Sequence, residues 1–151
     1  MLTTSQNHLT TGALSALNPI LDDTQYFQGK NRLSPALRPQ IEQAIEEIEN
    51  QLVPASQDRV EQIVLRLMLH FPSFPEEHKT RLCGDYTSML QNFPEDMLCA
   101  AYQYVLKHHQ SNALPRIADF LAFMEPEVER RKIIRQKLAV LLEQTTEEFA
   151  V

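Results

Sequence analysis

The stretch that decides the fold class is residues 56–71, which read SQDRVEQIVLRLMLHF. Its apolar side chains recur three and four positions apart, which places them on one face of an α-helix; they are Val60, Ile63, Val64, Leu67, Met68 and Phe71. Ser56 stands where an N-cap is expected, because its hydroxyl can accept a hydrogen bond from a first-turn N–H. Leu65 lies off this stripe, so the pattern predicts a helix that is apolar over much of its surface.

Helical periodicity continues on both sides of this stretch. Prolines punctuate it at the positions where a first helical turn tolerates the missing N–H. Ser34 and Pro35 indicate the start of the first helix. In an alternative interpretation, Pro39 marks the start and the helix begins at residue 39. Helices are therefore predicted over residues 35–53, 56–71, 75–91, 95–109, 115–124 and 126–146.

The composition also favours helices over strands. The 151 residues include 3 Gly, no Trp and 9 Pro, while the good helix formers Leu, Ala, Glu, Gln and Met are abundant. Strands and hairpins need glycine and β-branched residues, which are scarce here. The predicted fold is all-α, a compact array of about six helices, and a chain of this length suggests one domain, over residues 34–151.

Residues 1–33 lack a sustained period and hold two of the three glycines. A polar, weakly periodic segment buries too little apolar surface to offset its ordering entropy, so a flexible N-terminal tail is predicted over residues 1–33. One apolar cluster inside it has helical spacing and is a candidate partner-binding peptide that folds on contact: Leu14, Leu17, Ile20 and Leu21. The alternative interpretation, and the commoner outcome for such a segment, is a transient helix in the tail.

Charge and cysteine content limit the classes of function. The net charge of −6 argues against a broad, non-specific grip on nucleic acid. No apolar run approaches the roughly 20 residues that span a bilayer, and no secretory signal is visible, so a cytoplasmic location without membrane contact is expected. Cys83 and Cys99 are then expected to be reduced.

No pattern in the chain predicts catalysis, a metal or a cofactor. Three glycines cannot supply a Walker or dinucleotide loop. The cysteines and histidines lack the paired ligand spacing of a zinc site, and nothing indicates a group that would orient a Cys–His nucleophile. The sequence therefore predicts a protein that is not an enzyme, with no catalytic residues, metal ligands or cofactor.

The most basic segment is residues 129–137, ERRKIIRQK. Five cations in it are candidate nucleic-acid contacts: Arg130, Arg131, Lys132, Arg135 and Lys137. At 100° per residue, however, they surround the helix and do not share one face, and acidic residues precede them. A solvated, charge-balanced helix is the alternative interpretation.

The same helix carries more apolar surface than one stripe requires. Ile133 and Val140 lie on the flank away from Leu138 and Leu142. Surplus apolar surface on a terminal helix is typical of a partner contact or of self-association, so Ile133 and Val140 are candidate partner-binding residues. The alternative is that this helix is packed between two neighbours of its own domain.

A series of short motifs between residues 60 and 131 resembles the small helical domain of phage replicative-helicase loader and inhibitor proteins and related prophage replication proteins. The motifs are Leu69-His70-Phe71-Pro72, Tyr86 with Leu90, Phe93-Pro94-Glu95, Ala100-Ala101 with Tyr104, and Leu114-Pro115-Arg116-Ile117-Ala118-Asp119-Phe120. Two features depart from that family. Tyr86 stands where the family often has Trp, and the predicted tail precedes the helical domain instead of following it.

The resemblance implies a non-enzymatic replication accessory protein. Such proteins bind a hexameric replicative helicase, hold it inactive and deliver it to an origin through an origin-bound initiator. The resemblance therefore implies a helicase as the partner, with an origin-binding initiator as a second candidate. Two other functions stay open. One is a small DNA-binding regulator that uses residues 126–146, and the other is a phage assembly protein that self-associates through the same helix.

Overall fold

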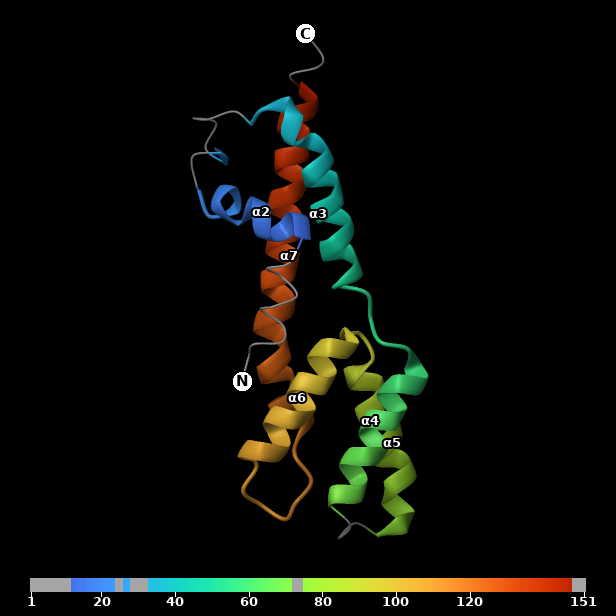
Figure 1. The fold of residues 1–151 in the computed structure, drawn as a ribbon. Coiled ribbons are helices and arrows are strands. Elements are labelled where there is room, and N and C mark those ends of the chain that lie inside the picture. Colours follow the sequence, from blue (N-terminus) through green and yellow to red (C-terminus); the bar gives the residue numbers. More distant parts are fainter. Residues whose placement is uncertain (1–11, 24–25, 28–32, 72–74, 148–151) are drawn as a thin grey trace. The chain divides into compact units, whose positions relative to one another are not determined.

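The computed structural model describes residues 12–23, 26–27, 33–71 and 75–147. Within these residues lie six α-helices and a short 3-10 turn, η2 (Pro35–Leu37), and no strand. The helices are α2 (Gly12–Leu21), α3 (Arg38–Asn50), α4 (Gln57–His70), α5 (Glu76–Leu90), α6 (Glu95–His108) and α7 (Ile117–Glu147) (Figure 1). The prediction of an all-α fold is confirmed.

The chain divides into two compact units, where the sequence predicted a single domain over residues 34–151. Unit 1 contains Val53–Val128, and unit 2 contains Ser5–Leu52 together with Glu129–Val151. The reason is visible in α7, whose side chains supply two separate cores. Phe120 and Met124 belong to the core of unit 1, whereas Leu138 and Leu141 belong to that of unit 2. Periodicity identifies the apolar stripe of each helix, but it does not identify which helices pack against one another.

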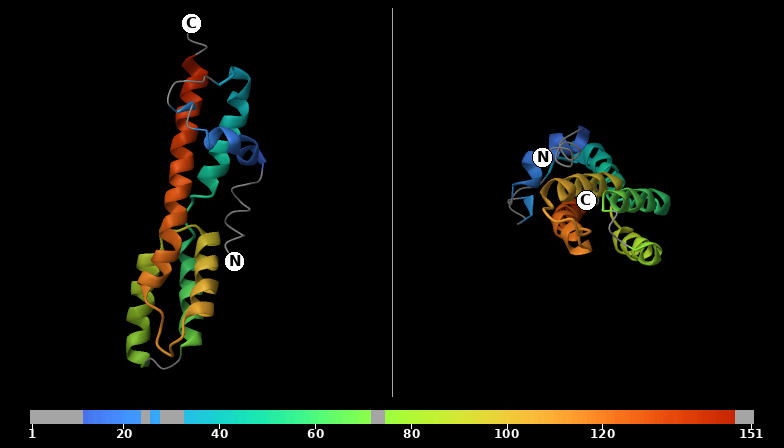
Figure 2. Two further views of the ribbon diagram at one scale, coloured as in Figure 1. Left: turned by 90° about the vertical axis from the view of Figure 1, so that its left-hand side faces the viewer. Right: turned by 90° about the horizontal axis from the view of Figure 1, so that it is seen from below.

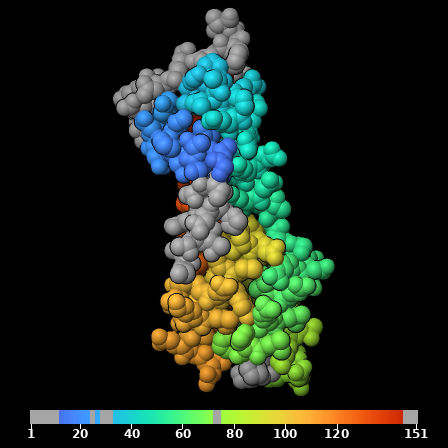
Figure 3. Space-filling view, viewed as in Figure 1, coloured from blue at the N-terminus to red at the C-terminus, as the bar shows by residue number. Residues whose placement is uncertain are grey.

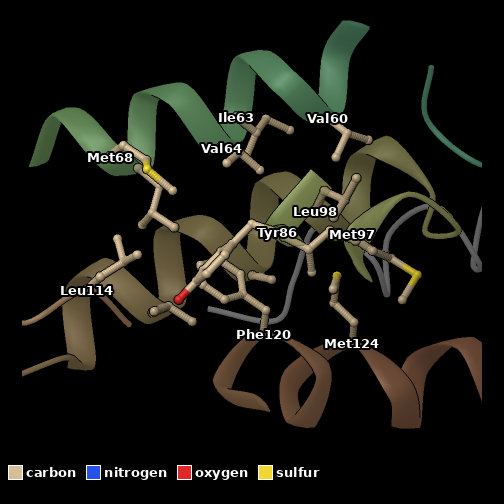
Figure 4. Packing of buried hydrophobic residues seen from close by; sticks show 14 residues of the cluster. Val60, Ile63, Val64, Met68, Tyr86, Met97, Leu98, Leu114, Phe120 and Met124 are labelled. Carbon is tan, nitrogen blue, oxygen red and sulfur yellow. The ribbon is translucent and has the colours of Figure 1, made fainter. Parts of the chain in front are cut away.

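Unit 1 is built from α4, α5, α6 and the first turns of α7. The apolar stripe predicted for residues 56–71 lies on α4 and packs against residues of the other three helices (Figure 4). The Ser56 hydroxyl accepts a hydrogen bond from the backbone N–H of Arg59 at 3.2 Å, which confirms the predicted N-cap. The turn before α6 is tied to the turn before α4, because the Ala55 N–H donates to the carbonyl of Phe93.

Tyr86 of α5 joins the core of unit 1 to the loop before α7. Its ring is buried among apolar side chains (Figure 4), and its hydroxyl donates a hydrogen bond to the Pro115 carbonyl at 2.6 Å. Burial raises the pKa of this hydroxyl above its ordinary value, and the negative charge of Asp119 raises it further. Tyr86 and Pro115 both belong to the motifs between residues 60 and 131, and in the structure they pack together within unit 1.

The helices predicted at 115–124 and 126–146 form one continuous helix, α7, with Pro126 inside it. The prediction of a break at Pro126 was wrong. A proline inside a helix leaves the carbonyl four residues earlier without its N–H partner, and that residue is Ala122. Ala122 and Pro126 are both exposed, so water can satisfy this carbonyl and the helix continues.

Unit 2 is built from α2, α3 and the later turns of α7, with α2 lying against α3 (Figures 2 and 3). Part of the predicted tail is therefore ordered, because residues 12–21 form a helix whose leucines are buried with Ile41, Ala44 and Ile48 of α3. The physical reason is that the apolar surface of this segment finds its partner about thirty residues away. Residues 1–11, 24–25 and 28–32 of the predicted tail lie outside the described residues.

The Tyr86 bond gives a test of the core of unit 1. We expect Tyr86→Phe to lower the free energy of unfolding at pH 7 by about 1 kcal/mol, the usual net value of one hydrogen bond. Because the pKa is raised in the folded state, the stability linked to it is complete below the unfolded value of about 10 and is lost as the pH rises above it. The variant should therefore lose stability less steeply than the parent between about pH 9 and 11 in urea titrations.

Tyr104→Phe is the matched control, because the Tyr104 side chain is exposed on α6. This variant should have nearly the same urea midpoint of unfolding as the parent, and its stability should fall with pH between about pH 9 and 11 as steeply as that of the parent. Equal slopes for the parent and Tyr86→Phe would contradict the assignment of a buried, protonated phenol to Tyr86.

Candidate interaction surfaces

The structure places the candidate peptide residues of α2 inside unit 2. Leu14, Leu17 and Leu21 are buried and Ile20 is half-buried. They pack on α3 and α7 of the same chain. As described, these side chains are not available to a partner, which corrects the prediction that they form a free binding peptide.

The N-terminal end of α2 is held by a carboxylate from α3. The Glu47 side chain accepts hydrogen bonds from the backbone N–H groups of Ala13 and Leu14, each at 3.2 Å. These are unpaired first-turn donors, and a negative charge there also suits the helix dipole. Gly12 has φ of +62°, and a side chain at this position would clash with the Glu47 carboxylate. The hydrogen bonds from Ala13 and Leu14 to the Glu47 carboxylate therefore depend on glycine at position 12.

Two side chains of α7 hold the other end of α2 and the segment that follows. The Lys137 ammonium donates to the carbonyl of Leu21 at 3.2 Å and lies 5.5 Å from the centre of the Phe27 ring. The Gln144 amide donates to the carbonyl of Tyr26. Lys137 is half-buried by these contacts, so its role is to bind the C-terminal end of α2. This corrects the prediction that Lys137 contacts nucleic acid.

Arg131 is also not a surface cation. Its side chain is 0% exposed and donates a hydrogen bond of 2.6 Å to the Gln51 carbonyl, at the C-terminal end of α3. The prediction that Arg131 contacts nucleic acid was wrong, because its guanidinium satisfies a carbonyl that helix geometry leaves unpaired. A sequence signal existed: Arg131 precedes the buried Leu138 by seven residues, which places both on one stripe of α7.

The other three candidate cations of α7 remain exposed. They are Arg130, Lys132 and Arg135. Lys132 lies 3.8 Å from the Glu129 carboxylate, a pair on the solvent side of the helix. The five-residue cluster is thus reduced to three exposed charges, which favours the interpretation of a solvated helix over a phosphate-binding face.

Ile133 and Val140 are exposed, at 49% and 38%. They lie seven residues apart on α7 and so share one line along the helix. Neither side chain belongs to the core of unit 2. The structure therefore leaves both candidate side chains at the surface and does not pack them into the core of unit 2.

Unit 1 carries a second exposed apolar surface, a groove of about 740 Å³ between α4 and α5. Leu65 and Leu69 line its α4 side and are 55% and 80% exposed. Cys83, Gly84 and Thr87 line its α5 side, and a side chain added at Gly84 would meet no atom within 4 Å. The sequence placed Leu65 outside the core stripe of its helix, and this was the available signal for the groove.

The opposite side of α4 carries a polar hollow shared with α6. Arg59 binds the Glu95 carboxylate at 2.6 Å, and this hydrogen bond raises the pKa of Arg59 above its ordinary value. Tyr102 also lines this hollow, and burial raises the pKa of its hydroxyl. The Arg59–Glu95 pair joins α4 to the first turn of α6, so we assign it a structural role.

The described residues include no group of three His, Cys, Asp or Glu side chains placed to hold a metal ion. Cys83 and Cys99 are free thiols on α5 and α6. Among the described helices, none is long and apolar enough to cross a membrane.

Comparison with known proteins adds no relative from which a role could be transferred. No protein-family model, no curated protein and no solved structure matches the chain.

The assignment of Arg131 predicts the effect of removing it. Arg131→Ala should lower the free energy of unfolding of unit 2 by about 2–4 kcal/mol, because it leaves a cavity and an unpaired carbonyl at the end of α3. Arg135→Ala, an exposed change of the same type four residues later, should change it by no more than about 0.5 kcal/mol. Thermal and urea unfolding would measure both, and similar small effects would refute the buried contact.

Proposed function

We propose that this chain is a non-enzymatic DNA-replication accessory protein that binds a hexameric replicative helicase and loads or inhibits it. It acts through protein–protein contacts and connects the helicase to a second protein, an origin-bound initiator. The observation that carries the proposal is that each of the two units exposes its own apolar surface. One is the pair Ile133 and Val140 on α7, and the other is the α4–α5 groove.

A connecting protein needs two such surfaces, and apolar side chains are the usual source of affinity in a protein interface. Large aliphatic side chains that stay exposed in a folded chain cost free energy in water, which a partner can relieve by covering them. The proposal assigns the α7 surface to the helicase and the groove to the initiator. The open groove has Leu65 and Leu69 on one wall and small residues such as Gly84 on the other, with Glu61 and Lys79 among the polar side chains that also line it. Such a groove suits one inserted amphipathic helix of a partner.

The identity of the partners is supported by the resemblance of residues 60–131 to helicase loaders. Most of the matching side chains pack together in unit 1, among them Tyr86, Leu90 and Ile117. Leu69 and Tyr104 are exceptions, because both are exposed: Leu69 lines the α4–α5 groove, and the Tyr104 ring stacks on Phe123 at 4.7 Å between centroids. The shared pattern thus describes mainly how unit 1 packs, and of its side chains Leu69 also lines a proposed binding surface.

The α7 surface gives the first test of this proposal. The double variant Ile133→Glu with Val140→Glu should weaken binding to the cognate helicase at least tenfold, which is about 1.4 kcal/mol, because two charges would enter an apolar contact. Since both side chains are exposed, the variant should keep the far-UV circular dichroism and the melting temperature of the parent. The parent should hydrolyse no ATP by itself and should change the ATPase rate of the helicase.

Arg135→Gln with Ala139→Glu is the matched control. It changes the net charge by the same amount at exposed positions of the same helix, turned away from the line of Ile133 and Val140. The control should bind the helicase as the parent does. If the parent itself neither binds the helicase nor alters its ATPase rate, the proposed function is wrong.

The groove gives a separate test. Leu65→Gln with Leu69→Gln adds no charge and changes two exposed side chains, so the fold should survive. The expected result is at least tenfold weaker binding to the initiator and unchanged binding to the helicase, measured by titration calorimetry. Loss of helicase binding in this variant would show that the two surfaces are assigned to the wrong partners.

A further inference from the structure

We propose that the apolar surface of α3 and α7 that α2 covers, the α2 groove, is a docking site for a short apolar helix of a partner protein. In the described structure α2 occupies this α2 groove and would compete with the partner helix. The proposal refines the α7 contact of the proposed function. Its test uses no helicase, so the two proposals can fail separately.

The first argument is that α2 would not be a stable helix in isolation. It has ten residues, one of them Pro19, and no charged side chain. Isolated helices shorter than about 12–15 residues are marginal in water even with favourable sequences. The helical form of α2 must therefore come from the groove, so the groove is a surface that orders a short helix laid on it.

The second argument is that the groove recognises a helix by its ends as well as by its apolar face. Glu47 of α3 binds the free N–H groups at the start of α2, and Lys137 of α7 binds a carbonyl at its last residue. Every helix has such unpaired groups at its two ends, with the same polarity. The groove can thus orient any helix of this length, whatever its sequence outside the apolar positions.

The chemistry of the fitting partner follows from α2 itself. The buried leucines stand at positions i, i+3 and i+7, as Leu14, Leu17 and Leu21. They pack against Ile41, Ala44 and Ile48 of α3 and Leu138 and Leu141 of α7. A matching partner helix has leucine-sized side chains at these spacings and no charge among them, because a charge buried there would lack a partner.

The third argument is continuity with the exposed surface of α7. Ile133, Lys137, Val140 and Gln144 follow one another at i, i+4, i+7 and i+11, which is one line along the helix. Lys137 and Gln144 hold the α2 segment, and Ile133 and Val140 are exposed beside them. A partner that covers Ile133 and Val140 therefore lies next to α2, and displacing α2 would extend its contact into the apolar groove.

The experiment measures whether the groove accepts this helix from outside. The probe is a fluorescent, amidated peptide with the sequence of residues 12–23, GALSALNPILDD, titrated into the full chain by fluorescence anisotropy. Leu17→Asp should empty the groove by placing a charge on the buried face of α2. The peptide should then bind this variant at least tenfold more tightly than it binds the parent, in which α2 competes.

Ala16→Asp is the matched control, since Ala16 is exposed on the same helix and the added charge is the same. It should bind the peptide as weakly as the parent. A peptide of equal composition with its three leucines moved out of register should bind none of the chains. Equal peptide affinity for Leu17→Asp and Ala16→Asp would overturn the proposal, as would no binding by a folded Leu17→Asp chain.

Gly12→Ala keeps the test decisive if Leu17→Asp affects more than α2. The added methyl group displaces the Glu47 carboxylate and leaves the groove itself unchanged, so the peptide, which keeps its glycine, should bind this variant more tightly than the parent. Cooperative loss of α3 and α7 helicity in both variants would show that α2 cannot be exchanged, and would overturn the proposal.

Light scattering identifies the occupant. The parent should remain monomeric at micromolar concentration, because its own α2 fills the groove. A dimer that is absent in Leu17→Asp would assign the groove to α2 of a second copy, and so would overturn the choice of a separate partner.

Discussion

The position of α2 in unit 2 depends on the contact between the Glu47 carboxylate and the first N–H groups of α2. Two helices alone, α3 and the later turns of α7, bury one seam between them. A third element is needed to enclose side chains such as Ile48 and Leu141. The helix α2 does this together with Leu33 and Phe27 from the segment that follows it. It is too short to be stable by itself and is fixed by Glu47 at one end and Lys137 at the other.

This constraint changes the meaning of the charges on α7. A run of five cations near the end of a chain suggests a nucleic-acid contact when it is read without a structure. In unit 2, Arg131 donates a hydrogen bond to a carbonyl at the C-terminal end of α3, and Lys137 donates one to a carbonyl at the C-terminal end of α2. Both satisfy carbonyl groups that helices cannot pair internally. The exposed side chains of α7 then include the apolar pair Ile133 and Val140 together with three cations, Arg130, Lys132 and Arg135.

The features predicted correctly from the sequence are those that depend on local spacing. The stripe from Val60 to Met68 and the Ser56 cap each follow from positions within one helix. Leu65 was placed off the core stripe by the same reasoning, but the groove beside it needs α5 as its other wall. The division into two units was missed because periodicity does not say which helices pair.

Other features were missed because their partners lie far along the chain. The helix α2 has weak local signals and gains its stability from α3, and Arg131 meets Gln51 across eighty residues. Pro126 was taken for a helix start because proline usually marks one. Its cost inside α7 is small, however, since the carbonyl that it leaves unpaired is on an exposed turn. Predictions from sequence spacing were therefore correct where the stabilising contacts lie within one helix.

The most direct test of this account is residue-resolved amide hydrogen exchange on the full chain. The central claim is that α2 belongs to the core of unit 2 but is its most weakly held helix. The account predicts clear protection for the amides of Leu17 and Leu21, at a smaller opening free energy than for Ile48 of α3 and Leu141 of α7. Exchange of the α2 amides at the rate of an unfolded peptide would contradict the claim, because it would mean that α2 is not docked on α3 and α7.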